Sequence, residues 1–210
     1  MRSATPRRGL LLGALGILAV PRRSIRAQPQ DAAAAEDVVA DDSPFDITPQ
    51  IATPAHPLPS ARERWIWAVN NANEEVAVAY RTGEAYLPGP MAQLQGLFRD
   101  LRENTPGPLP PLLVDMLSLL QERYGYQRPL RVLSGFRTLR TNMSLEGAAP
   151  NSFHLHGYAA DFYLPRVPVL DVAIATLELS RRFGFMGVGF YRQFVHVDVG
   201  PARAWTSFDA

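Results

Sequence analysis

The chain has 210 residues, a formal net charge of +1 and no cysteine. This length suits one domain with a substantial hydrophobic core and is too short for two large domains. A charge so close to zero gives no general electrostatic support for nucleic-acid binding. The lack of cysteine excludes disulfides, thiolate metal ligands and cysteine nucleophiles from this sequence. A metal site must therefore use His, Asp or Glu, and the sequence holds only four histidines.

The N-terminal residues have the pattern of an export signal. Arg7 and Arg8 precede an apolar run that ends at Val20, and the small residue Ala27 follows. The run is shorter than the roughly 20 apolar residues that span a bilayer, and paired arginines before such a run are typical of twin-arginine signals. We therefore expect a twin-arginine-type signal peptide over residues 1–27, with a membrane-tethered N-terminus as the alternative. Both interpretations place the folded part in the periplasm.

The next segment, residues 28–61, is rich in Ala, Asp and Pro and shows neither a helical nor a strand period. Such a segment has too little apolar surface to offset the entropy lost on ordering, so we expect a flexible linker. His56 lies inside it and is interpreted as a solvated histidine. The folded domain is expected over residues 62–210.

Within this domain, apolar periodicity predicts helices first and most of the sheet afterwards. Helical stripes of apolar residues are expected at 94–101, 112–120 and 169–183. Strand-like runs are expected at 76–82, 130–136, 159–164, 187–191 and 194–199. This order indicates an α+β fold with a small, mainly antiparallel sheet and flanking helices. The aromatic residues Trp65, Trp67 and Tyr80 are interpreted as core residues, with a place along a substrate groove as the alternative.

The last strand-like run, 194–199, places polar groups on one face. Side chains alternate along a strand, so Phe194, His196 and Asp198 point one way and the three valines of the run point the other way. The valine face is expected to join the core. An imidazole and a carboxylate then lie side by side on the opposite face.

A second carboxylate, Asp161, lies in the strand-like run 159–164 among alanines and aromatic residues. A buried carboxylate costs several kcal/mol unless it is paired or bound to a cation. The loop before this run carries His154 and His156. If the two strands are neighbours, His, Asp and His meet at one point, which suits a zinc ion with a fourth position open to water. Histidines that only satisfy core hydrogen bonds are the alternative.

The residues around these candidates form a specific pattern. The two runs read Ser152-x-His154-x-x-Gly157-x-Ala159-x-Asp161 and Val195-His196-Val197-Asp198. This paired signature resembles that of the M15-type zinc peptidases, which include D-alanyl-D-alanine carboxypeptidases and murein endopeptidases. The likeness is closer to the murein endopeptidase K branch and spans roughly residues 64 to 205. Further residues that fit the branch are Leu133-Ser134-Gly135-Phe136-Arg137-Thr138, Asn142, Gly187-Val188-Gly189-Phe190-Tyr191 and Arg203-Ala204-Trp205.

The resemblance implies a fold like that of hedgehog and D-Ala-D-Ala peptidases, with peptidoglycan stem peptides as the substrate. It implies that His154, Asp161 and His196 are the ligands of Zn²⁺. Arg137 would point into the cleft and hold a substrate carboxylate or stabilise the developing oxyanion, with a surface ion pair as the alternative. Ser152 could form a hydrogen bond within the site or cap the turn.

One position departs from the pattern of the carboxypeptidase relatives. Those proteins carry a Glu as general base three residues before the last zinc-binding His, and this sequence has Gln193 there, which cannot accept a proton at neutral pH. Asp198 is the candidate for the base, because it follows His196 on the same strand face. Its rival role is to accept the second ring N–H of a zinc-bound histidine. His156 is a reserve candidate for proton transfer.

The sequence thus predicts an exported zinc-dependent murein endopeptidase that hydrolyses the peptide cross-links of peptidoglycan. A D-alanyl-D-alanine carboxypeptidase is one alternative, which Gln193 disfavours. A non-catalytic, zinc-containing peptidoglycan-binding module is another, because ligands alone do not establish turnover. An exported α+β domain without a metal is the third. No nucleic-acid partner is expected, and contact with a membrane is expected only through an uncleaved signal segment.

Overall fold

The computed structural model describes residues 50–52 and 63–207. The predicted signal peptide lies outside the described residues, as do His56 and most of the predicted linker. The backbone N–H of Ala52, within that linker, donates to the carbonyl of Val199 at 2.7 Å. Among the described helices, none combines the length and the apolar character needed to cross a membrane.

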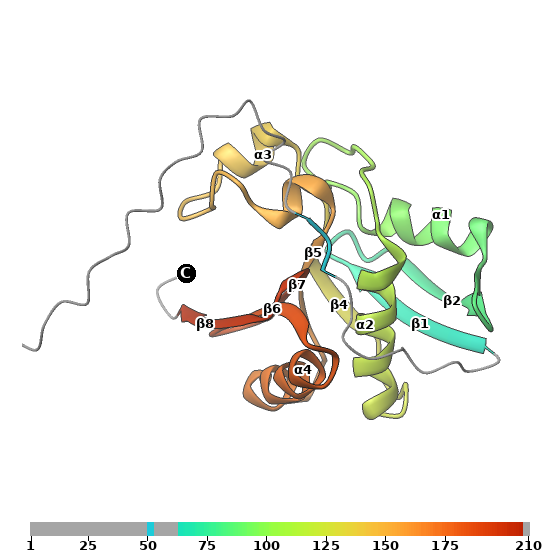
Figure 1. The fold of residues 1–210 in the computed structure, drawn as a ribbon. Coiled ribbons are helices and arrows are strands. Elements are labelled where there is room, and N and C mark those ends of the chain that lie inside the picture. The colour runs from blue at the N-terminus through green and yellow to red at the C-terminus, as the bar shows by residue number, and fades with distance from the viewer. Residues whose placement is uncertain (1–49, 53–62, 208–210) are drawn as a thin grey trace, which may run out of the picture. The chain divides into compact units, whose positions relative to one another are not determined.

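The described strands form one mixed sheet (Figure 1). In chain order they are β1 (Glu63–Asn70), β2 (Glu75–Thr82), β3 (Ala85–Tyr86), β4 (Leu130–Ser134), β5 (Ala159–Tyr163), β6 (Phe185–Tyr191), β7 (Val195–Pro201) and β8 (Arg203–Ser207). Their spatial order is β3-β2-β1-β4-β5-β7-β6-β8, and only the β1–β4 and β6–β8 pairs are parallel. The predicted α+β class with a mainly antiparallel sheet is confirmed. The sheet is larger than expected, because β1, β3 and β8 were not predicted.

The described helices flank this sheet. They are α1 (Pro88–Leu97), α2 (Pro111–Arg123), α3 (Leu139–Met143), the short 3₁₀ helix η1 (Phe153–His156) and α4 (Val169–Phe183). The helices predicted at 112–120 and 169–183 are confirmed. The helix predicted at 94–101 begins and ends earlier, because two prolines fit its first turn and Phe98 already leaves it. The carbonyl of Phe98 instead accepts a hydrogen bond from the backbone of Phe136 at 2.8 Å.

Strand β1 places its two tryptophans differently. Its side chains alternate, with Ile66 and Ala68 fully buried and Trp65 on the outer face. Trp65 is 47% exposed, so its assignment to the core was wrong, whereas Tyr80 is fully buried as expected. Trp67 is partly buried, and its indole N–H donates to a carboxylate at the sheet surface.

The arrangement of β7 separates the core from the site. Its valines are buried, and both α2 and α4 contact this strand. His196 and Asp198 alternate with the valines and therefore point to the opposite face. In Figure 1, α4 lies on one side of β6, β7 and β8, and the segment that carries α3 lies on the other. The hydrophobic core thus fixes the strand while its polar face meets the loops between β4 and β5.

Candidate active site

His154 is held by the short helix η1. The hydroxyl oxygen of Ser152 accepts a hydrogen bond from the backbone N–H of His154 at 3.3 Å, so Ser152 caps this turn. Gly157 ends the turn in the left-handed region, at φ 69°. A Cβ on Gly157 would lie 1.8 Å from the carbonyl oxygen of Pro108, so only glycine fits there. The imidazole is thereby fixed over the sheet and is 2% exposed.

Asp161 and His196 face each other across two neighbouring strands. Strand β5 pairs with β7 in antiparallel register, and these two residues are direct partners. The Asp161 Oδ1 atom lies 2.8 Å from His196 Nδ1 and 3.3 Å from His154 Nε2. The two imidazole nitrogens are 3.2 Å apart. The structure therefore brings the three predicted ligands together at one point.

The second nitrogen of each imidazole has its own acceptor. His154 Nδ1 lies 2.6 Å from the carbonyl oxygen of Gly135, and His196 Nε2 lies 3.2 Å from Asp198 Oδ2. Metal-binding histidines characteristically donate their remaining N–H to a carbonyl or a carboxylate in this way, which fixes the tautomer and the ring orientation. In the tautomers that these acceptors favour, His154 Nε2 and His196 Nδ1 each present a lone pair to a cation bound beside Asp161.

The spacing of these donor atoms suits zinc. Tetrahedral zinc with bonds of about 2.0–2.1 Å places neighbouring donor atoms about 3.3 Å apart. The three donor pairs here are separated by 2.8, 3.2 and 3.3 Å. Two imidazoles and one carboxylate also match the donor types that zinc prefers, and three protein ligands leave a position for water. The residues present therefore fit the ion.

The electrostatics of the cluster call for positive charge. Burial favours the neutral form of the Asp161 carboxyl, but attraction to both histidines and their hydrogen bonds hold its pKa well below the usual range. Burial would likewise lower the pKa of His196, but Asp161 and Asp198 outweigh it and raise the pKa to about 9. Burial dominates at His154 and lowers its pKa. The carboxylates of Asp161 and Asp198 thus favour positive charge at this point, and a divalent cation would supply it.

Asp198 is fully buried, and its oxygens are occupied. Oδ1 accepts from the backbone N–H groups of Gly187 and Gly200 at 3.3 and 2.9 Å. The Arg203 guanidinium donates to Oδ1 and Oδ2 at 3.0 and 2.6 Å. Burial opposes ionisation, but the hydrogen bond from His196 and the charge of Arg203 lower the pKa of Asp198. A Cβ at position 187 would lie 2.4 Å from Asp198 Oδ2. Only glycine at this position therefore leaves room for the Asp198 carboxylate.

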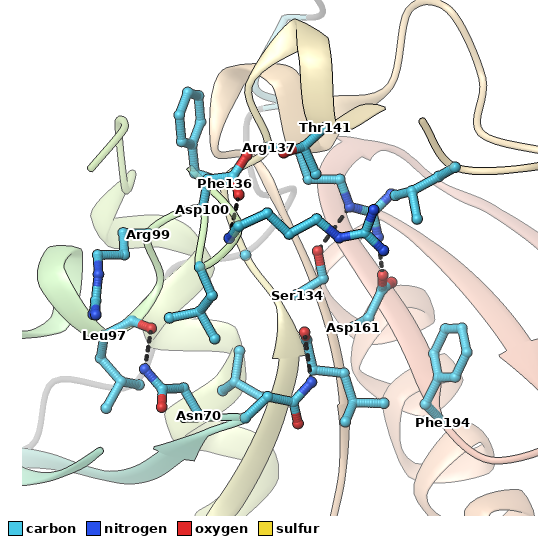
Figure 2. Close-up of a pocket in the computed structure, with 17 residues that line it drawn as sticks. Asn70, Leu97, Arg99, Asp100, Ser134, Phe136, Arg137, Thr141, Asp161 and Phe194 are labelled. Atoms are coloured by element: carbon cyan, nitrogen blue, oxygen red, sulfur yellow. Dashed lines mark hydrogen bonds and ion pairs between the residues drawn. The ribbon is translucent and has the colours of Figure 1, made fainter. Parts of the chain in front are cut away.

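Arg137 reaches the candidate metal ligands from the loop that follows β4. Its Nε donates to Ser134 Oγ at 2.7 Å, and its Nη2 forms an ion pair with Asp161 Oδ2 (Figure 2). Its backbone N–H also donates to the carbonyl of His154 at 2.9 Å. The side chain is 15% exposed, so the guanidinium still borders solvent in the cleft. Arg137 therefore lies beside the ligand cluster, as the resemblance implies.

Two adjoining clefts border the cluster. The larger, of about 850 Å³, is lined by all three candidate ligands and by Arg137. The smaller, of about 480 Å³, is lined by Arg137 and Asp161 and extends toward β1. The ligands therefore lie at the floor of an accessible groove.

Aromatic side chains form one wall of the larger cleft. Tyr191 and Phe194 stack with ring centroids 4.4 Å apart. The indole N–H of Trp205 donates to the Tyr191 hydroxyl at 3.2 Å, and the indole lies 5.3 Å from the His196 ring. Arg203 and Trp205 belong to β8, which pairs in parallel with β6. Sequence reasoning noted these two residues but gave them no role, because nothing local shows that β8 returns to this edge.

The remaining candidates for proton transfer differ in position. Gln193 is exposed between β6 and β7, and neither Gln193 nor His156 is among the described residues that line the two clefts. Glu146 was missed, although it lines the larger cleft. Among the described lining residues it is the one acidic side chain there besides Asp161. It is exposed and forms no hydrogen bond or ion pair with another described residue.

A mixed sheet that presents two histidines and an aspartate at the floor of a groove, beside an arginine, has the arrangement expected of a metallopeptidase. A model of the protein family described as peptidoglycan L,D-endopeptidase MepK matches residues 59–205. The peptidoglycan L,D-endopeptidase MepK of Escherichia coli (strain K12) is 36% identical over 166 residues, which cover 75% of this chain and 86% of that protein. The probable peptidoglycan L,D-endopeptidase MepK of Haemophilus influenzae is 32% identical over 142 residues, which cover 64% of this chain and 74% of that protein.

The chain belongs to this family, the MepK branch of the M15-type peptidases. The resemblance seen in its sequence is thereby confirmed. M15-type peptidases are in general zinc-dependent, and the His154, Asp161 and His196 cluster is able to hold a metal ion.

Proposed function

We propose that this protein is a zinc-dependent peptidoglycan L,D-endopeptidase that hydrolyses peptide cross-links between stem peptides. The observation that carries the proposal is the convergence of His154 Nε2, Asp161 Oδ1 and His196 Nδ1 on one point of the groove. Membership of the MepK family supports the reaction, and the names of the relatives support the L,D bond. The proposal places the protein in the periplasm after twin-arginine export, with a signal peptide over residues 1–27 and a flexible linker over 28–61. It also includes a hedgehog-like peptidase fold.

In this proposal His154, Asp161 and His196 hold Zn²⁺, and the carbonyl of Gly135 and the carboxylate of Asp198 orient the two imidazoles. Zinc in this site would supply Lewis-acid activation of a water molecule and of the scissile carbonyl group.

Arg137 would act on the substrate. One edge of its guanidinium is fixed by Ser134 and Asp161, which leaves N–H groups at the border of the cleft. A fixed, charged donor at this position can stabilise the negative charge that develops on a carbonyl oxygen or hold a substrate carboxylate. The contact with Asp161 couples the position of the guanidinium to that of the ligand cluster.

The proton of the attacking water needs an acceptor. Asp198 is poorly suited to this role, because it is fully buried and accepts hydrogen bonds from His196, Arg203 and two backbone N–H groups. Glu146 is suited to it, because it borders the same cleft as the ligands and has no competing partner among the described residues. We propose that Glu146 is the general base and that Asp198 positions His196.

The test uses purified protein, isolated sacculi and analysis of the muropeptides released. We expect cross-linked muropeptides to disappear, uncross-linked ones to form, and a chelator to prevent both. Defined dimers joined by an L,D or a D,D bond would show which bond is cut, and we expect the L,D dimer to be hydrolysed faster. Release of terminal D-alanine without loss of cross-links would establish a carboxypeptidase. Unchanged muropeptides with retention of the protein on sacculi would establish a binding module.

A further inference from the structure

The smaller cleft continues the groove past the ligand cluster. It shares Arg137, Leu145, Asp161 and Phe194 with the larger cleft and then runs toward the end of β1. Figure 2 shows Asn70, Leu97 and Arg99 at its far end, and Asp161 and Phe194 at the end near the metal ligands. The groove is therefore open on both sides of Asp161. We call the smaller cleft the second arm.

An open second arm fits the proposed reaction. A peptide cross-link joins two stems, so its substrate extends on both sides of the bond to be cut. A terminal carboxypeptidase substrate extends on one side only. The second arm, with a volume of about 480 Å³, offers space for chain beyond the scissile bond.

Two arginines of the second arm are already neutralised. Arg99 forms a two-pronged ion pair with Glu74, at 2.5 and 2.8 Å. A hydrogen bond from Arg99, and to a smaller extent one from Asn70, lowers the pKa of Glu74 to about 2. Glu74 therefore stays ionised and keeps its ion pair with Arg99. Arg137 is paired with Asp161.

Asp100 also lines the arm, but its oxygens are used within the protein. Oδ1 accepts from the backbone N–H groups of Arg102 and Glu103 at 2.9 and 3.2 Å, and Oδ2 accepts from that of Thr138 at 2.8 Å. Asp100 is 3% exposed, so it contributes little negative charge to the surface of the arm. Its hydrogen bonds hold the loop that presents Arg102.

Arg102 is the exception among the arginines of the arm. Its Nη1 donates to Ser144 Oγ at 2.9 Å, and it has no acidic partner within 4.0 Å in the part of the chain that the structure describes. The side chain is exposed and lines the second arm. A guanidinium with free N–H groups at the rim of a groove is suited to bind a carboxylate.

We propose that the second arm binds the part of the cross-linked substrate beyond the scissile bond, and that Arg102 pairs with a free carboxylate of that part. This proposal rests on the proposed function. Ser144 holds one N–H group of the guanidinium. Arg99 is paired with Glu74, and Arg137 lies beside Asp161, where it would act at the scissile bond. Arg102 is therefore the cation available to a carboxylate farther along the arm. The ligand class is a peptide that carries a carboxylate.

The experiment compares Arg102→Gln with the unaltered chain on two substrates. One is a cross-linked muropeptide dimer with free carboxylates, and the other is the same dimer with these carboxylates amidated. We expect Arg102→Gln to raise KM for the first about twofold to fivefold with little change in kcat, as for one charge-assisted contact at an exposed site. KM for the amidated dimer should not change between the two proteins.

Two variants serve as controls. Ser144→Ala removes the hydrogen bond to Arg102 but keeps the guanidinium, so KM should change less than in Arg102→Gln. Arg181→Gln makes the same change of charge at an exposed position of α4 that borders neither cleft, and it should leave KM unaltered. An equal rise in KM for both dimers, or no rise for the first, would overturn the assignment of Arg102.

Binding of each dimer to the zinc-loaded proteins, measured by calorimetry, separates this proposal from the proposed function. If the unaltered chain binds the dimer but does not cut it, the proposed function fails while the second arm is still tested. In that case Arg102→Gln should weaken binding of the free-carboxylate dimer alone, and equal affinities for both proteins would reject the second arm.

Discussion

Asp115 and Asp161 are both buried carboxylates beside an arginine, yet their surroundings differ in kind. Asp115, on α2, accepts from the hydroxyls of Tyr80 and Tyr86 at 2.8 and 2.5 Å and from Arg81 at 3.2 Å. Burial and the charge of Asp115 raise the pKa of Tyr80, so its hydroxyl remains a donor. Every partner of Asp115 is a donor, and the cluster borders neither cleft.

Asp161 has a different set of neighbours. One oxygen is held by Arg137, while the other faces the ring nitrogens of His154 and His196. These nitrogens are able to donate lone pairs to a metal ion, because the second nitrogen of each ring has its own acceptor. The point where the three meet also borders both clefts through Asp161.

The difference teaches how a buried carboxylate should be interpreted. When a buried carboxylate is surrounded only by hydrogen-bond donors, its charge and lone pairs are satisfied within the protein, and it stabilises the fold. When a buried carboxylate faces the lone pairs of other side chains, its negative charge lacks a partner until a cation binds between them. Loss of Asp161 should therefore affect zinc and activity, whereas loss of Asp115 should affect stability.

The largest effect is expected for Asp161→Asn. An amide is a weak zinc ligand, so zinc affinity and peptidoglycan hydrolysis should each fall by more than about a thousandfold. The fold should persist, because the neighbouring hydrophobic strands are unchanged. Metal analysis, muropeptide analysis and circular dichroism check these outcomes. Full zinc content in the variant would remove Asp161 from the ligand set.

Glu146→Gln is expected to have the next largest effect, and it sharpens the contrast because Glu146 has no hydrogen-bond or ion-pair partner among the described residues. Removal of a general base lowers kcat by roughly 10²- to 10⁴-fold. Zinc content and thermal stability should stay unchanged, since the side chain is exposed and forms no hydrogen bond or ion pair with another described residue. Steady-state kinetics on a defined dimer give the measurement. A kcat within about threefold of the unaltered protein would reject Glu146 as the base.

Local sequence patterns predicted the candidate ligands around Asp161, but they did not predict the position of Glu146 or the partners of Asp115. The period of two along β7 predicted that His196 and Asp198 share a face, and the cost of burying Asp161 predicted a partner for it. Glu146 lies in a loop without periodicity, so its place at the cleft depends on tertiary folding. Asp115 looks like an ordinary acidic residue of an amphipathic helix, because its tyrosine partners come from β2 and β3, about 30 residues earlier.

Asp115→Asn tests the other side of the comparison. Among the described residues, this change leaves the buried Arg81 without a counter-charge. The free energy of unfolding should therefore fall by about 3 kcal/mol, or about a hundredfold in the folding equilibrium. Urea denaturation measures this change. Tyr86→Phe is the matched control, since it removes one hydrogen bond to Asp115 and should cost about 1 kcal/mol. Zinc content and kcat of the folded variant should match those of the unaltered protein, and loss of zinc would contradict the division between the two regions.

Asp198 combines features of both carboxylates and gives the smallest expected effect. Like Asp115 it is fully buried and surrounded by donors, and like Asp161 it contacts His196, a candidate metal ligand. If it positions His196, Asp198→Asn should weaken zinc binding by about 10- to 100-fold, the range typical of such partners. The activity of this variant should then be low at limiting zinc. At saturating zinc it should recover to within about threefold of the activity of the unaltered protein.

The opposite pattern would identify Asp198 as the base. Zinc affinity would then be unchanged, and kcat would fall by about 10²-fold or more even at saturating zinc. The zinc dependence of activity in this one variant therefore separates the two roles. Because Arg203 also holds Asp198, Arg203→Lys is a useful companion that keeps the charge but loses the two-pronged contact. A smaller shift in the same direction for this variant would show that the position of Asp198, and through it that of His196, sets the affinity for zinc.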